Sequence, residues 1–157
     1  MSVYPPQEEG VYAFTQRKMS WQTSTDDNRY RRGMYTFFYR SAPYPMLETF
    51  DVPKFNTTCT RRDRSNTPLQ SLTVSNSEAM FELAQAFGER IRQSAATDSD
   101  RIAFAFRTCF ARTPSASETD RLTRYLQQSR RRFNDDGLCW TAVSRLLFNL
   151  DEFITRE

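Results

Sequence analysis

LCWTAVSRLLFNLDEFI, residues 138–154, carries the richest apolar face of the 157-residue chain. Its apolar side chains recur every three or four positions, which places them on one side of an α-helix. They are Leu138, Cys139, Ala142, Val143, Leu146, Leu147, Leu150, Phe153 and Ile154. We therefore expect one helix from Leu138 to about Ile154. Because its apolar face is so wide, this helix should lie at the centre of a bundle.

Four helices are predicted before this stretch, each where a polar capping residue precedes an apolar stripe of helical spacing. The predicted starts are Thr67 followed by Pro68, Ser77, Asp98 or Ser99, and Ser115 or Ser117. The four helices should extend to about residue 75, to Ile91, to Pro114 and to Phe133. Gly88 inside the second weakens its helix propensity. The predicted fold class is mainly α, a four- to five-helix bundle in the C-terminal two-thirds of the chain.

Residues 1–65 have a different composition and no sustained helical period. They hold five of the seven prolines and six of the seven tyrosines. We expect loops and short strands there, with GMYTFFYR (33–40) as the strand candidate because aromatic and β-branched residues dominate it. The predicted organisation is an irregular, partly β segment over 1–65 and a helical domain over 66–157.

The composition excludes several kinds of site. The chain has no histidine, so Ser-His-Asp, Cys-His and His-based metal chemistry are excluded. Cys59, Cys109 and Cys139 lie far apart, which rules out a C-x-x-C pair, the haem-attachment motif C-x-x-C-H and a four-cysteine zinc site. We expect reduced thiols, no metal and no cofactor in this chain. No stretch is apolar enough to span a membrane, and the first residues are not a signal peptide.

The densest polar cluster is RRDRSN, 61–66, just before the predicted helix at Pro68. Backbone N–H groups and arginine side chains at a helix start can bind an anion. The alternative is a structural hub in which arginine and aspartate pair with each other and with loop carbonyls. The candidate hub residues are Arg61, Arg62, Asp63, Arg64 and Asn66.

A second candidate site is the predicted strand and the residues before it, where arginines alternate with aromatic residues. Such residues can stack on sugar rings, or stack on bases while pairing with phosphates. The alternatives are therefore a polysaccharide-binding surface, a single-stranded nucleic-acid site, or simply a strand packed on one face. The candidate residues are Arg29, Tyr30, Arg31, Arg32, Tyr35, Phe37, Tyr39 and Arg40.

Carboxylate pairs give a third hypothesis, a glycan hydrolase using two acids. Glu48 with Asp51, or Asp26 with Asp27, would supply the pair, although exposed turn acids have the same pattern. Asp151 and Glu152 are expected to form salt bridges with the basic helices. The run 130–132, three arginines, is interpreted as a solvated helix end whose cations favour the helix C-terminus.

Six segments in series resemble the C-terminal part of a planctomycete-specific domain of unknown function that is found downstream of planctomycete cytochrome c modules. The segments are VYPP (3–6), RYRRGMYTF (29–37), PMLETFD (45–51), RRDRSNTPLQ (61–70), ARTPSASE (111–118) and LLFNLDEFITRE (146–157). The resemblance covers nearly the whole chain in order. It implies a large exported protein in which a secretory signal, a haem-binding region and a first domain precede this one.

From this resemblance we expect a non-catalytic structural or interaction module, the C-terminal piece of an exported, cytochrome-linked protein. The chain begins in the middle of the family's terminal domain, so we expect a truncation, a late start or a decayed gene. Haem would belong to the missing upstream module. The expected partner is the missing N-terminal part or another exported protein, with polysaccharide and nucleic acid as alternatives. Export follows from the resemblance alone, since this chain carries no signal of its own.

Overall fold

The computed structural model describes residues 2–7, 10–11, 20–25, 27–40, 42–54, 58–61 and 65–155. The chain divides into two compact units, Met1–Thr73 and Val74–Glu157. The division falls inside helix α2 (Pro68–Asn76), whereas the sequence places the change of character at residue 66. The described residues are mainly helical, as predicted, with seven α-helices and two 3₁₀ turns among them.

The helices of the second unit begin at capping residues that satisfy their first backbone N–H groups. The helices are α3 (Glu78–Ser94), α4 (Asp98–Phe110), α5 (Ala116–Arg132), α6 (Asp136–Phe148) and α7 (Asp151–Ile154). Ser77 caps α3 and Ser115 caps α5, as predicted, and Ser115 forms a capping box with Glu118. The cap of α4 is Thr97, one residue before the predicted start, and that of α6 is Asp135.

The single helix predicted over 138–154 is wrong, because the structure divides it into α6 and α7. Asn149 ends α6, and its side chain donates a hydrogen bond to Ser75 Oγ at 3.0 Å. Leu150 then takes an extended conformation and precedes α7. The break allows the ring of Phe153 to stack on that of Phe148, with 4.8 Å between centroids. Tertiary contacts therefore override an apolar pattern that would continue one helix.

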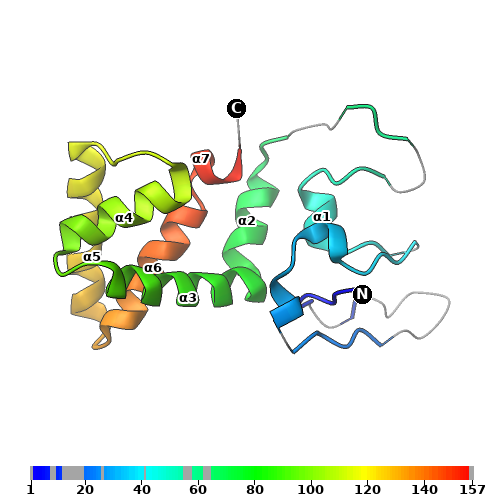
Figure 1. The fold of residues 1–157 in the computed structure, drawn as a ribbon, viewed down its shortest axis with the longest axis horizontal. Helices are drawn as coiled ribbons and strands as arrows, with labels where there is room; N and C mark the ends of the chain where they lie inside the picture. Colours follow the sequence, from blue (N-terminus) through cyan, green and yellow to red (C-terminus); the bar gives the residue numbers. More distant parts are fainter. Residues whose placement is uncertain are drawn as a thin grey trace. The chain divides into compact units, whose positions relative to one another are not determined.

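Helix α6 is the central helix of its unit, as predicted, and contacts α3, α4, α5 and α7 (Figure 1). Its fully buried side chains extend beyond the predicted stripe, because Trp140 and Ser144 are buried while Leu138 is 44% exposed. Because other helices cover α6 on several sides, its buried residues are not confined to a single apolar stripe. Around it the core consists of Ile91, Ile102, Ala105, Phe106, Leu122, Leu126, Cys139, Trp140, Val143 and Leu147.

The tightest contact in this core is between the backbones of α3 and α6 at Gly88. A Cβ atom on Gly88 would lie 2.7 Å from the backbone nitrogen of Thr141 and 2.8 Å from the carbonyl carbon of Trp140. Backbone atoms cannot move aside as a flexible side chain can. Gly88 is therefore the position that allows α3 to approach α6.

Arg112 joins three helices at one end of the unit. Its guanidinium forms two hydrogen bonds with the Glu118 carboxylate, at 2.7 and 3.0 Å, and two with that of Glu152, at 2.8 and 2.7 Å. The same group lies 5.1 Å from the ring centroid of Phe106. Arg112 lowers the pKa of both carboxyl groups, that of Glu118 to about 2. The predicted salt bridge of Glu152 with a basic residue is confirmed.

Arg130 makes the equivalent connection at the opposite ends of α4 and α5. Its guanidinium contacts Asp98 in the first turn of α4 at 2.5 and 3.1 Å, and Asp136 in the first turn of α6 at 2.8 Å. Because the end of α5 meets the start of α4, these two helices are antiparallel, as predicted from their short connection. Arg130 lies at the exposed end of α5, as predicted for 130–132, and its ion pairs with Asp98 and Asp136 are an additional role that the prediction did not include.

The first unit contains a cluster of aromatic rings. Trp21 stacks on Tyr44 at 5.9 Å between centroids and packs edge-on against Tyr4 at 5.0 Å, while Tyr4 stacks on Phe37 at 5.0 Å. Backbone carbonyls satisfy the polar ends, since Trp21 Nε1 donates to Pro5 O and the Tyr44 hydroxyl donates to Pro6 O. The rings thus form a small core that needs no regular secondary structure.

The strand predicted over 33–40 is wrong. Gly33–Tyr35 forms a 3₁₀ turn, and in the described part of the chain the one β contact is an isolated parallel bridge between Val3 and Thr36. The Val3 N–H donates to Tyr35 O, and the Phe37 N–H donates to Val3 O, both at 2.8 Å. A pattern of aromatic residues suits a buried loop as well as a strand, because both bury ring surface.

Replacing Gly88 with alanine is expected to destabilise the helical unit by about 2 kcal/mol, because the added methyl group overpacks the contact with α6. Ala86→Gly, at an exposed position of the same helix, is the matched control. It should cost about 1 kcal/mol from helix propensity alone. Urea denaturation followed by far-ultraviolet circular dichroism measures both. Equal stability of Gly88→Ala and the parent protein would contradict the close approach.

Glu118→Gln is expected to lower the free energy of unfolding by about 1 kcal/mol at pH 7, since the ion pair is partly exposed. The folded pKa of Glu118 is about 2 and its ordinary value is 4.5, so the stabilisation is present above pH 4.5 and lost as the pH falls toward 2. Denaturation between pH 2.5 and 7 should show the two proteins converging. The exposed Asp120, replaced with asparagine, is the control. A difference that stays constant with pH would refute the role of the ionised carboxylate.

Candidate functional site

The structure describes only part of the predicted polar hub. Arg62, Asp63 and Arg64 lie outside the described residues, and Arg61 and Asn66 are exposed. The neighbouring Ser65 is the residue that contacts the rest of the unit. Its N–H and hydroxyl donate to Asp51 Oδ2 at 2.8 and 2.6 Å, and its Oγ accepts from Gln70 Nε2 at 3.0 Å.

The arginine and aromatic residues of 29–40 differ in their exposure and contacts. Phe37 belongs to the ring cluster, whereas Tyr30 is 56% exposed and Tyr35 38% exposed. The Arg31 guanidinium lies 5.6 Å from the ring centroid of Tyr35. Arg29 Nη1 donates to Ser24 O at 3.5 Å. Arg32 and Arg40 are exposed, and Tyr39 is half-buried.

The carboxylates of the hydrolase hypothesis have unequal surroundings. Asp51 takes a left-handed backbone conformation, with φ 54°, and its carboxylate accepts both hydrogen bonds from Ser65. Glu48 is exposed in α1 (Pro45–Thr49), and Asp27 is exposed in the 3₁₀ turn Asp27–Tyr30. Asp26 is not among the described residues. Asp51 thus serves to hold a turn.

Burial raises the pKa of two of the three thiols, that of Cys109 to about 11 and also that of Cys139, while Cys59 is exposed. Both groups are consequently thiols rather than thiolates at neutral pH. Across the described residues, no group of three or more acidic or cysteine side chains is placed to hold a metal ion. None of the described helices is long and apolar enough to cross a membrane.

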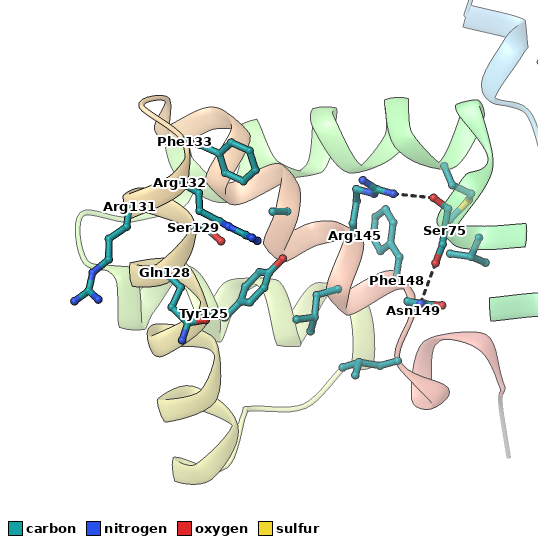
Figure 2. A pocket seen from close by; sticks show the side chains of 15 residues that line it. Ser75, Tyr125, Gln128, Ser129, Arg131, Arg132, Phe133, Arg145, Phe148 and Asn149 are labelled. Carbon is teal, nitrogen blue, oxygen red and sulfur yellow. Dashed lines mark hydrogen bonds between the residues drawn. The ribbon is translucent and has the colours of Figure 1, made fainter. Parts of the chain in front are cut away.

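The candidate site is a groove in the helical unit, with a volume of about 840 Å³, which we call the α5–α6 groove. Cavities of roughly 300–1,000 Å³ are typical of small-ligand sites. One wall comes from the second half of α5, the other from α6, and the start of the unit closes one end (Figure 2). Its lining residues are Val74, Ser75, Met80, Tyr125, Gln128, Ser129, Arg131, Arg132, Phe133, Ala142, Arg145, Leu146, Phe148, Asn149 and Leu150.

The α5 wall carries four polar side chains in one stripe. Tyr125, Gln128, Ser129 and Arg132 are spaced by three, one and three residues, which places them on the same face of the helix. In Figure 2, Arg132 and the Tyr125 hydroxyl point toward one another, and Arg131 points away from the hollow. Ser129 is only 4% exposed, and within the described residues its hydroxyl forms no hydrogen bond. Guanidinium, amide and hydroxyl groups all supply hydrogen-bond donors, so this wall is suited to bind a group that accepts hydrogen bonds.

The α6 wall is apolar, with a fixed polar end. Ala142 and Leu146 lie on α6, and Leu150 follows it just after the end of the helix. Arg145 Nη2 donates to Ser75 O at 2.8 Å, and its guanidinium lies 5.5 Å from the ring centroid of Phe81. Together with the hydrogen bond from Asn149 to Ser75, this contact holds the start of the unit against α6 (Figure 2).

The groove has a positive charge that its own lining does not balance. Among the described lining residues there is no aspartate or glutamate, while three are arginines. Arg145 is held by Ser75, but Arg131 and Arg132 form neither a hydrogen bond nor an ion pair in the described part of the chain. An anionic group would therefore meet an unpaired arginine beside apolar side chains.

Sequence reasoning did not find this groove. The sequence contains the Tyr125, Gln128, Ser129 and Arg132 stripe, but the arginines of 130–132 were interpreted together as a solvated helix end. The second wall comes from α6. The packing of the two helices decides which of their faces enclose a groove, and the spacing of apolar residues in the sequence does not predict that packing.

A family model matches the chain. No curated protein and no solved structure matches the chain. The matching family model is described as "PSD1: Protein of unknown function (DUF1553)" and covers residues 1–126. The groove residues from Gln128 onward lie beyond the matched part of the chain. The match therefore carries no information on most of the groove. Because the model covers most of the sequence, the chain belongs to the PSD1 (DUF1553) family of proteins of unknown function.

Proposed function

We propose that this chain is a non-catalytic interaction module that binds its partner in the α5–α6 groove. The observation that carries the proposal is the contrast between the charged groups of the helical unit. Four carboxylates, those of Asp98, Glu118, Asp136 and Glu152, form ion pairs that join helices, while Arg132 in the groove has no partner among the described residues. Paired charges at the helix ends and an unpaired arginine in the groove are what we expect of a rigid scaffold with an open binding surface.

The pKa values support a scaffold role for the acidic groups. Arginine side chains lower the pKa of Glu89, Asp98, Glu118 and Glu152. A carboxyl group that donates a proton in catalysis at neutral pH needs the opposite shift, toward a higher pKa. The buried thiols of Cys109 and Cys139 are similarly poor nucleophiles, because their pKa values are raised.

The resemblance in sequence supports a finer proposal, that the module works in an exported, cytochrome-linked protein. We expect the DNA upstream of the Met1 codon to continue in frame into a coding region with a secretory signal and a C-x-x-C-H motif. Sequencing that region, and measuring the mass of the protein in its native cells, tests this. An in-frame stop codon with a ribosome-binding site next to Met1 would contradict it.

Filling the groove is expected to abolish binding. The anionic dye 1-anilinonaphthalene-8-sulfonate should bind the full chain saturably, one molecule per chain, with a fluorescence increase. Gln128→Trp places a large ring in the groove and should remove this binding. Gln127→Trp is the matched control, since Gln127 is the adjacent exposed glutamine and does not line the groove. Equal dye binding by both variants would refute the groove as the site.

A further inference from the structure

We infer that the α5–α6 groove is a binding site for a small single-chain amphiphile with a carboxylate head and an alkyl body. The inference rests on the proposed function, because it assigns a ligand class to the same groove. Three features of the groove carry it: the donors on its α5 wall, the single unpaired arginine directed into it, and the apolar α6 wall opposite.

The α5 wall is suited to a group that accepts hydrogen bonds. Arg132 offers guanidinium N–H groups and no acceptor, and Tyr125, Ser129 and Gln128 each supply a donor on the same helix face. None of these four side chains has a hydrogen-bond partner in the described residues. A planar carboxylate matches the fork of a guanidinium, and such charge-assisted bonds are stronger than neutral ones.

The expected charge of the ligand's head group depends on how many arginine side chains in the groove can bind it. Of the three lining arginines, Arg145 donates to Ser75 O, and Arg131 points away from the hollow (Figure 2). That leaves Arg132 as the cation directed into the groove. One positive charge balances the single charge of a carboxylate, whereas a phosphate monoester carries between one and two negative charges at neutral pH.

The opposite wall gives the body of the ligand its chemistry. Ala142 and Leu146 lie one turn apart on α6, Leu150 follows the end of that helix, and Met80 and Val74 also line the groove. These side chains offer no hydrogen-bonding group, so an alkyl chain fits them and a sugar or a nucleobase does not.

The size of the groove separates a small molecule from a peptide. Arg132 lies seven positions after Tyr125, which is a rise of about 10 Å along a helix. An extended peptide of that length has only three or so residues. A single alkyl carboxylate presents acceptor oxygens to the donors of the α5 wall and an apolar body to the opposite wall.

The test is titration calorimetry of the full chain with decanoate, compared with decanol and decyl phosphate. We expect decanoate to bind at one site per chain and more tightly than either analogue. Arg132→Gln should weaken decanoate binding about tenfold or more, because a hydrogen-bonded charge is lost. Tyr125→Phe should weaken it several-fold. Arg124→Gln, an exposed arginine on α5 that does not line the groove, is the control and should leave the affinity within twofold.

Circular dichroism of each variant shows whether the helices are intact, and the two groove variants test the same contact independently. Equal affinities for decanoate and decanol, or decanoate binding unchanged in both variants, would overturn the inference. A six-residue peptide of leucine and glutamate separates the two proposals. If the peptide binds and Gln128→Trp abolishes its binding while decanoate fails to bind, the ligand class is wrong and the proposed function stands. If Gln128→Trp affects no probe, both fail.

Discussion

The helical unit depends on the contact between α3 and α6 at Gly88, where two backbones meet with no side chain between them. That approach covers one side of α6 and allows Trp140, Val143 and Leu147 to be fully buried. The remaining helices then pack on the other sides of α6, and their ends are joined by the ion pairs of Arg112 and Arg130. Because the scaffold is held from its core and its ends, the face of α5 that lines the α5–α6 groove is left available for binding.

Most of the helical fold could be predicted from the sequence, because helix starts are local. Ser77 and Ser115 cap the helices that their position predicts, and Thr67 forms hydrogen bonds with Gln70 at the start of α2. Errors arose where distant residues decide the conformation. The hydrogen bond of Asn149 to Ser75 accompanies the end of a helix that the apolar pattern would continue. Gly88, a weak point by helix propensity, is where the packing is closest.

The candidate site was beyond sequence reasoning for a geometric reason. Successive residues of a helix point about 100° apart, so three adjacent arginines cannot share one environment. Arg130 bonds to Asp98 and Asp136, Arg131 points away from the groove, and Arg132 points into it (Figure 2). A charge run treated as one solvated patch hides these three roles. The mainly helical prediction survives such errors, since it depends on apolar spacing, whereas a site depends on the direction of individual side chains.

The chain carries two tryptophans, and each lies in the core of a different compact unit. Trp21 belongs to the ring cluster of the first unit, and Trp140 is fully buried in the second. The molecule therefore contains one intrinsic optical reporter for each unit. Emission from a protein that keeps only Trp140 follows the helical unit alone, and emission from one that keeps only Trp21 follows the aromatic unit. Whether the two halves melt together or separately can thus be seen without any added label.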